Sequence, residues 1–413
     1  MSEIDVKITA VKNAIRKSRP MCSGTCEIPP DQNVLVYGFQ EDGTAKWVDL
    51  LKATPEQLDV VSAACQRATF GRNKEDVFDE TYRKAGQMST NDFRIGFNLE
   101  KSGIIDAVYS QLLDGFSDPD KGINAELYKL NIYDKGSFFK AHKDTPRGQN
   151  MFGSLVIVFP TVHAGGALLV RHDNKEEAFD SSKMLAPFDT SNVAYIAFYG
   201  DVEHEVAVVE SGHRVTLTYN LYFAGGPSAS LPKMTSAGTA NDLQSALVAL
   251  LDEPNFLADG GILGFGMRYK YPVDSNTNLR GMKSLLKGAD ALLVRVCEEI
   301  GLQTSLKAVY SPNDEGMVMM DKILDPDGDM GEFEESATDV LSRDYGGEMI
   351  QAPEWDEEEE RNITAVKWIT PMSARTPLRA TYIAYGNEHS IEYVYGDLAL
   401  MVHVPDADSR GAQ

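Results

Sequence analysis

The central part of the chain contains short apolar runs that are typical of β-strands. They are rich in valine, isoleucine, leucine, tyrosine and phenylalanine, and clusters of glycine, proline, asparagine and aspartate separate them. Short strands at this spacing favour a compact β-sandwich or barrel. The predicted strands of this region are 125–133, 153–159, 166–171, 192–199, 205–209 and 214–223.

The flanking regions combine helical and extended patterns. Apolar residues recur at helical spacing in 1–20, 54–70, 101–114, 242–251 and 281–301, and strand-like runs follow at 363–369, 380–385 and 398–404. Residues from about 226 to 240 are rich in serine, proline, glycine and alanine, which predicts a linker or long loop.

The chain is therefore expected to be an α+β protein in three parts. An N-terminal support region of helices and strands covers 1–120, and the β-rich core covers 121–225. A C-terminal extension, 226–413, contains helices, an acidic loop and the final strands, and we expect it to pack on the core.

Composition is that of a packed globular protein. The chain has 413 residues, of which 43% are hydrophobic and 24% are charged. No apolar stretch has the length needed to span a bilayer, and the N-terminus lacks the apolar region of a secretory signal. These features predict a cytoplasmic protein with no membrane partner.

Acidic charge is concentrated in one stretch of the chain. The formal net charge is −23, and residues 314–361 hold 18 acidic and 3 basic side chains. This stretch is predicted to be a solvated loop, mobile in part, with a lid over the active site as one hypothesis. The overall acidity argues against a nucleic-acid partner, which requires a basic groove.

Histidines cluster in the β-rich core, where five of the seven lie between residues 142 and 213. His142 and Asp144 form an H-x-D motif at the end of a predicted strand. Side chains at i and i+2 of a strand point to the same face, so this pair can bind one metal ion. His204, where a later strand leaves a turn, is the candidate third ligand. Two histidines and one carboxylate with open coordination positions are typical of non-haem Fe(II) oxygenases, and these three are the predicted metal-binding and catalytic residues.

The other histidines of the core are poorer candidates. His172 directly precedes Asp173, which places the two side chains on opposite faces of a strand. His163 is predicted to lie in a loop, and His213 points to the face opposite its neighbour Arg214.

Arg214 and Thr216 lie on one face of a predicted strand, and this strand begins ten residues after His204. A guanidinium group suits the distal carboxylate of 2-oxoglutarate, and the neighbouring hydroxyl can add a hydrogen bond. Because a buried arginine without an anionic partner is unfavourable, its place in an apolar strand requires a ligand or an acidic neighbour.

The segment from Tyr128 to Phe223 resembles the catalytic domain of prolyl 4-hydroxylase-type 2-oxoglutarate/Fe(II) dioxygenases. The residues in the family's order are Tyr133, Gly136, His142-x-Asp144, Gly165-Gly166, His204 and Arg214. The resemblance implies a double-stranded β-helix (jelly-roll) core with flanking helices. It also implies Fe(II), 2-oxoglutarate as cosubstrate and O2, with ascorbate as a further candidate cofactor, and a role for Tyr133 in orienting 2-oxoglutarate.

Two further features qualify this resemblance. Many relatives have a cosubstrate-binding tyrosine on the strand after the H-x-D motif, but residues 153–159 contain none, so Tyr133, Ser154 and Thr216 are the candidates for that contact. The flanks at 68–71, 79–85 and 384–388 resemble uncharacterised fungal proteins built on this catalytic domain.

The predicted function is oxidation of an unactivated C–H bond in a small molecule or amino-acid-derived substrate, with release of succinate and CO2. Hydroxylation is favoured, and desaturation and ring closure stay open. Protein or peptidyl prolyl hydroxylation is the first alternative, because relatives of this domain also act on peptides. A zinc hydrolase with the same triad and a non-catalytic jelly-roll binding protein are the others. The sequence leaves the oligomeric state open.

Overall fold

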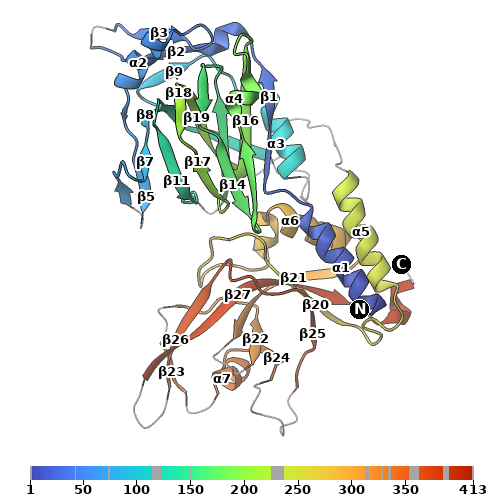
Figure 1. Ribbon diagram of the computed structural model, residues 1–413. Coiled ribbons are helices and arrows are strands. Elements are labelled where there is room, and N and C mark those ends of the chain that lie inside the picture. Colours follow the sequence, from blue (N-terminus) through green and yellow to red (C-terminus); the bar gives the residue numbers. More distant parts are fainter. Residues whose placement is uncertain are drawn as a thin grey trace. The chain divides into compact units, whose positions relative to one another are not determined.

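The computed structural model divides the chain into two compact units, each described by itself. The first unit comprises the described residues of 19–113 and 122–224, and the second those of 2–18 and 237–411 (Figure 1). The described residues are 2–41, 43–72, 75–113, 122–148, 150–224, 237–311, 316–326, 329–333, 336–352, 362–384 and 390–411. Among them, no helix is long and apolar enough to cross a membrane.

Two antiparallel sheets form the body of the first unit. The larger sheet has the order β1 (Met21–Glu27), β16 (Asn192–Tyr199), β12 (Met151–Val158), β19 (Arg214–Ala224), β10 (Gly122–Tyr133), β8 (Gly86–Ser89) and β4 (Gln66–Arg67). The smaller sheet has the order β15 (Lys175–Phe179), β14 (Leu168–His172), β17 (Glu203–Val206), β11 (Phe138–His142) and β7 (Arg83–Lys84). Side chains from both sheets line one cavity, so the sheets face each other around it.

Smaller elements extend and cover these sheets. They are the strand group β3 (Lys46–Asp49), β2 (Val34–Tyr37) and β9 (Phe93–Ile95), the pairs β13 (His163–Gly165) with β18 (Val209–Gly212) and β5 (Phe70–Arg72) with β6 (Glu75–Val77), and the helices α2 (Pro55–Ala63), α3 (Ile104–Leu112) and α4 (Ser181–Leu185). Helices α3 and α4 pack against β16 of the larger sheet. With one face against helices and the other toward the second sheet, seven of the eight residues of β16 are buried.

The mixed α+β class is confirmed, and each strand predicted in the β-rich core overlaps an observed strand. The strand predicted at 192–199 coincides with β16 at both ends. Its run of large apolar residues is typical of a strand that is covered on both faces.

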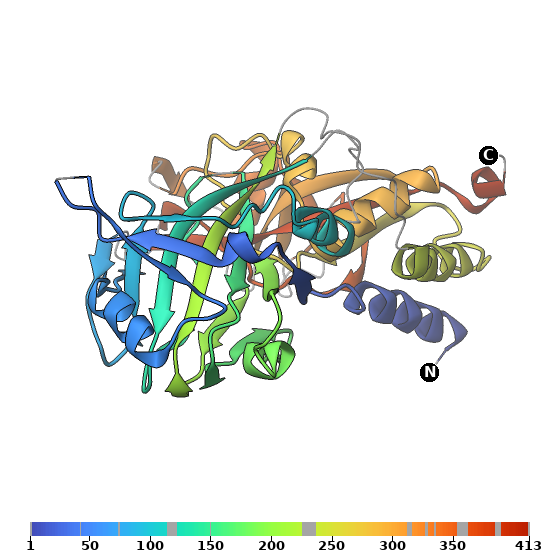
Figure 2. The ribbon, with the colours of Figure 1, turned by 90° about the horizontal axis from the view of Figure 1, so that it is seen from above.

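In the described residues of the second unit, one large sheet is accompanied by four α-helices. Its strands are β20 (Gly261–Gly266), β21 (Gln303–Ser311), β22 (Met317–Met320), β23 (Asp329–Phe333), β24 (Glu348–Gln351), β25 (Val366–Thr370), β26 (Leu378–Ala384) and β27 (Ser390–Val404). Its helices are α1 (Glu3–Arg16), α5 (Ala237–Leu251), α6 (Gly288–Glu299) and α7 (Ala337–Arg343). Figures 1 and 2 both show α1 beside α5.

This grouping differs from the three-part division expected from the sequence. Helix α1 belongs to the second unit because it packs against α5 and Lys7 pairs with Glu253 at 2.6 Å. The strands and helices of 19–113 belong to the first unit because β1, β4, β7 and β8 add directly to its two main sheets. Neither grouping can be read from local patterns, since both depend on contacts between distant segments.

The prediction of a solvated loop over 314–361 is wrong for the described parts of that stretch. Strand β22 and helix α7 are folded there, and β24 pairs with β22. Their apolar residues are buried, among them Val318, Met319 and Leu341. The acidic residues hid this pattern, because they outnumber the apolar positions that the sheet and helix cover. Residues 312–315, 327–328, 334–335 and 353–361 lie outside the described residues, as do most of the predicted linker and flanking motif 384–388.

Candidate active site

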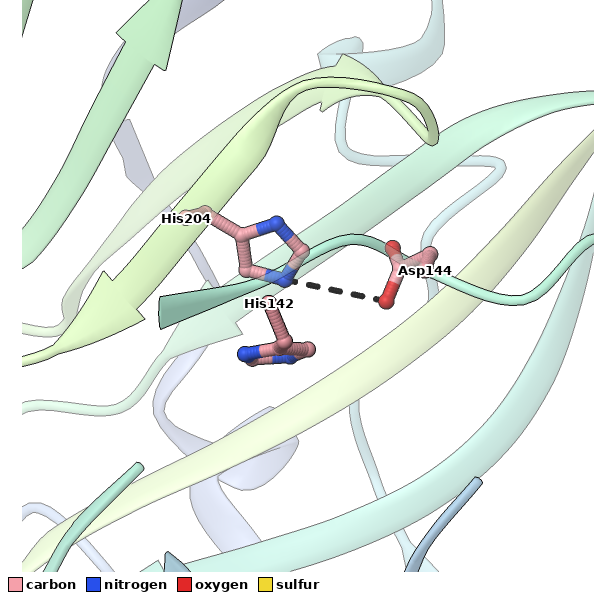
Figure 3. A group of neighbouring side chains, drawn as sticks. All are labelled: His142, Asp144 and His204. Atoms are coloured by element: carbon pink, nitrogen blue, oxygen red, sulfur yellow. Dashed lines mark ion pairs between the residues drawn. The ribbon is translucent and has the colours of Figure 1, made fainter. Parts of the chain in front are cut away.

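The structure brings His142, Asp144 and His204 together, and their candidate ligand atoms all lie within 4.8 Å of one another (Figure 3). His142 is the last residue of β11 and faces His204 of β17 across the strand pair. Asp144 lies two residues beyond the end of β11 rather than within the strand. His204 is buried, and the other two are partly buried. Three residues from two sequence regions therefore form one cluster on the smaller sheet.

Backbone carbonyls fix the orientation of both imidazoles. Nδ1 of His142 bonds to the carbonyl oxygen of Lys140 at 2.8 Å, and Nδ1 of His204 bonds to that of Val202 at 3.0 Å. A carbonyl oxygen only accepts, so each Nδ1 carries the hydrogen and each Nε2 keeps its lone pair. Burial, followed by the neighbouring His204, lowers the pKa of His142. The imidazole of His142 therefore stays neutral, as a metal ligand must.

Two hydrogen bonds, one to the carboxylate and one from the backbone, fix the position of Asp144. The Ser154 hydroxyl, on β12, donates to Oδ2 of Asp144, and the Asp144 backbone N–H donates to the Gly200 carbonyl at 3.0 Å. Its other oxygen, Oδ1, lies 3.6 Å from Nε2 of His204 (Figure 3). Ser154, a sequence candidate for cosubstrate contact, thus bonds to Asp144.

Arg214 is fully enclosed in the wall of the same cavity, with 1% of its surface exposed. Burial lowers its pKa to about 10, which leaves the guanidinium charged at neutral pH. Its Nη2 is buried and has no hydrogen-bond partner among the described residues. A buried charged donor without a partner is unfavourable, so this end of the side chain is suited to an anionic ligand.

A chain of hydrogen bonds holds the other end of Arg214. Its Nε donates to Oγ of Ser181 at 3.3 Å, and Oγ of Ser181 lies 3.0 Å from Nε2 of His163. Nδ1 of His163 bonds to the Thr161 carbonyl at 2.7 Å, so Nε2 must accept from the serine hydroxyl. Burial lowers the pKa of His163 to about 4 and keeps this ring neutral. His163, predicted to lie in a loop, is in β13 and is separated from Arg214 by one side chain.

The Gly165-Gly166 motif is explained by the space beside Arg214. Both glycines have positive φ values, 72° and 70°. A Cβ on Gly166 would lie 3.1 Å from Cδ of Arg214, and one on Gly165 would lie 2.5 Å from the Val208 carbonyl oxygen. Side chains are excluded here by both backbone conformation and space.

Tyr133 and Thr216 both lie beside Arg214. Tyr133 pairs with Arg214 between β10 and β19, and the guanidinium carbon is 5.7 Å from the tyrosine ring centroid. Thr216 is buried, and its Oγ1 is 3.4 Å from the Asn131 carbonyl oxygen. Both residues line the cavity.

The cavity has a volume of about 480 Å³ and includes residues that the sequence did not indicate. Arg83 and Asn131 are buried in its wall, and Tyr128 and Arg147 contact each other in its lining. No motif marks these positions. Pairing of β7 with β11 brings Arg83 beside Phe139, 56 residues away in the chain. Only the three-dimensional arrangement reveals them.

Comparison with known families agrees with this geometry. Residues 128–222 match the model of the 2OG-Fe(II) oxygenase superfamily. The resemblance predicted from the sequence is confirmed over this segment. Members of that superfamily have a jelly-roll core, and the protein is an oxidoreductase of the dioxygenase class. The cofactors of this superfamily are Fe(II), 2-oxoglutarate and O2. No curated protein matches the chain by sequence.

Solved structures similar to the chain include several prolyl hydroxylases. A Pseudomonas putida prolyl-4-hydroxylase is 14% identical, with a TM-score of 0.29, and the match covers 53% of this chain and 100% of that one. A Trichoplax adhaerens prolyl hydroxylase, solved with a hypoxia inducible factor peptide fragment, is 14% identical, with a TM-score of 0.27 and coverage of 53% and 92%. The collagen prolyl hydroxylase of Paramecium Bursaria Chlorella virus-1 is 12% identical, with a TM-score of 0.22 and coverage of 42% and 93%.

Proposed function

We propose that this protein is a 2-oxoglutarate- and Fe(II)-dependent dioxygenase that hydroxylates an unactivated C–H bond of a small molecule or amino-acid-derived substrate. The single observation that carries the proposal is that His142, Asp144, His204 and Arg214 line one cavity, with Nη2 of Arg214 unpartnered among the described residues. Each alone has a structural explanation. Together they supply a metal site and an anion site within one enclosed space.

The proposed metal ligands are Nε2 of His142, Nε2 of His204 and Oδ1 of Asp144. Two neutral imidazoles and one carboxylate are the donor set that suits Fe(II) with open coordination positions. The residues fit this role because both Nδ1 atoms and Asp144 Oδ2 are already hydrogen-bonded to the protein. Such outer contacts orient the remaining donor atoms toward a common point.

Arg214 is the proposed partner of the distal carboxylate of 2-oxoglutarate. Its Nη2 needs an anionic acceptor, and the Thr216 hydroxyl and Tyr133 lie beside it in the wall. A charge-assisted hydrogen bond to a carboxylate satisfies a guanidinium that burial has removed from water. This assignment places the cosubstrate between Arg214 and the three proposed ligands.

Fe(II), when bound with 2-oxoglutarate and O2, supplies the oxidising chemistry: the 2-oxo acid becomes succinate and CO2, one oxygen atom of O2 enters succinate, and the other enters the substrate. The chain's own residues hold the reactants and exclude water. Leu168, Phe198 and Val206 give the cavity apolar walls. Ser154 keeps the Asp144 carboxylate in place, and Ser181 keeps Arg214 in place.

Succinate formation tests the proposal. Metal-free protein is reconstituted with Fe(II) or, in parallel, with Zn(II), and given 2-oxoglutarate and O2 with a panel of free amino acids, organic acids, proline-containing peptides and cell extract. We expect succinate with Fe(II) only. Hydrolysis that Zn(II) supports would favour a zinc hydrolase, and failure to bind both Fe(II) and 2-oxoglutarate would favour a non-catalytic binding protein. Stimulation by peptides alone would replace the small-molecule substrate with a peptidyl one.

A further inference from the structure

The cavity is basic although the protein is strongly acidic. The chain has a formal net charge of −23. Yet the described residues lining the cavity include five basic side chains, Arg83, Lys129, Lys143, Arg147 and Arg214, against two acidic ones, Asp79 and Asp144. Lys143 and Arg147 are exposed, whereas Arg83 and Arg214 are buried. Positive charge is thus concentrated at this site although the net charge of the chain is negative. This local positive charge favours entry of anions.

The ring of Phe139 contacts both Arg83 and the proposed metal ligand His142. Arg83 is on β7, paired with Phe139 of β11, and only 7% of its surface is exposed. The guanidinium carbon is 4.5 Å from the Phe139 ring centroid. The same ring stacks on His142 at 3.5 Å between centroids, and it also contacts the rings of Phe70 and Tyr82. Packing therefore fixes Arg83 at a short distance from the reacting centre.

Among the described residues, the buried charge of Arg83 has no anionic partner. Its Nη2 donates to the side-chain carbonyl of Asn131 at 2.8 Å and its Nη1 to the backbone carbonyl of Thr69, both neutral acceptors. Its Nε is buried and has no hydrogen-bond partner, and no carboxylate lies within 4.0 Å, among the described residues. Arg171, on the surface of the same unit, pairs with Glu176, Glu203 and Glu205. A buried guanidinium without such a partner is unfavourable until an anion binds.

The cosubstrate does not supply that anion. This step rests on the proposed function. The charges of Fe(II) and Arg214 are balanced by Asp144 and the two carboxylates of 2-oxoglutarate, so this set of groups is neutral by itself. The charge of Arg83 remains unbalanced after the metal and cosubstrate are in place.

We propose that Arg83 binds a carboxylate of the substrate, so that the substrate is a small organic acid, a free amino acid included. The planar guanidinium suits a carboxylate. The carboxylate would balance the charge of the guanidinium from the cavity that Arg83 lines, while Asn131 and Phe139 keep the side chain in its present orientation. The exposed Lys143 and Arg147 raise the local concentration of anions near the cavity but do not select among them.

The test follows the Nε–H resonance of Arg83 in ¹⁵N-labelled full-length protein, with Zn(II) in place of Fe(II) and with saturating 2-oxoglutarate. The resonance is assigned by its absence from the Arg83→Gln spectrum, with Arg171→Gln as the matched control. Acetate is the probe, acetamide is its neutral counterpart, inorganic phosphate is the competing anion, and sodium chloride holds the ionic strength constant. We expect acetate to shift this resonance saturably, with acetamide and phosphate much weaker.

A second variant provides a test that does not depend on whether Arg83→Gln folds. Asn131→Asp places a carboxylate 2.8 Å from Nη2 of Arg83, and we expect it to weaken acetate binding at least tenfold. Asn220→Asp, which adds the same charge elsewhere in the cavity wall, should weaken it less. An Arg83 resonance that acetate does not move, or that acetamide or phosphate moves as much, overturns the proposal. Failure of the proposed function would show separately, as an Arg214 resonance that 2-oxoglutarate does not shift.

Discussion

Two buried arginines line the cavity, one from each of its facing sheets, and they are held in opposite ways. Arg214, on β19, is anchored through Nε by Ser181, and its Nη2 has no partner within the residues that the structure describes. Arg83, on β7, is anchored through both Nη atoms, and its Nε has no partner in the described part of the chain. Each side chain therefore has a fixed part and an unsatisfied part. The difference teaches that one cavity can offer two separate anion sites, which are assigned here to the cosubstrate and the substrate.

Loss of a proposed metal ligand should have the largest effect. His204→Ala removes one of three donors, so we expect no Fe(II) to remain after gel filtration and no succinate to form. Metal content is measured alongside turnover. His403→Ala, an exposed histidine of the second unit, is the control and should keep both. A His204→Ala protein that retains Fe(II) would remove His204 from the ligand set.

Arg214→Gln is the most direct test of whether the two arginines bind different ligands. The variant loses a charge-assisted hydrogen bond, which corresponds to about a ten- to hundredfold increase in the KM for 2-oxoglutarate. Fe(II) content should stay unchanged, because Arg214 is not a ligand. Arg171→Gln, a surface arginine of the same unit, is the matched control. Normal cosubstrate affinity in Arg214→Gln would mean that another cation, with Arg83 as the first candidate, binds that carboxylate.

Ser154→Ala should weaken the metal site without removing a ligand. Its hydroxyl donates to Asp144 Oδ2, and loss of a partner of this kind typically reduces metal affinity about tenfold or more. The Fe(II) dissociation constant is the measurement, and Ser154→Thr, which keeps a hydroxyl, should restore much of the affinity. If Ser154→Ala instead raises only the KM for 2-oxoglutarate, the residue contacts the cosubstrate, as the sequence had suggested.

Sequence information was sufficient for the residues that occur in a fixed order along neighbouring strands. His142, His204 and Arg214 could be selected because each lies on a β-strand, and Asp144, two residues beyond β11, could be selected from the H-x-D motif. Arg83 could not, because its position depends on the pairing of β7 with β11. Ser181 was equally hidden, since it begins a five-residue helix and contacts Arg214 across 33 residues.

The same contrast holds for the fold: local patterns predicted individual strands, whereas contacts between distant segments could not be predicted. Strand β16 was predicted at both ends because a continuous apolar run between turn residues is a local signal. Strands β22 and β24 were missed because acidic residues surround their apolar positions. The grouping of α1 with the C-terminal residues depends on its contact with α5, more than 200 residues away in the chain, and no periodicity reports such a contact.

The smallest predicted effect concerns the anchoring of Arg214. Ser181→Ala removes the oxygen that accepts from Nε of Arg214 and the hydrogen that is donated to His163. Loss of about 1 kcal/mol of neutral hydrogen bonding corresponds to a KM for 2-oxoglutarate about fivefold higher, with kcat and Fe(II) content unchanged. Ser182→Ala, the next residue, loses a hydrogen bond to Asp180 instead and should leave the KM unchanged. Equal changes in both variants would mean that the serine only stabilises the helix, whereas a rise confined to Ser181→Ala would show that it positions the arginine for the cosubstrate.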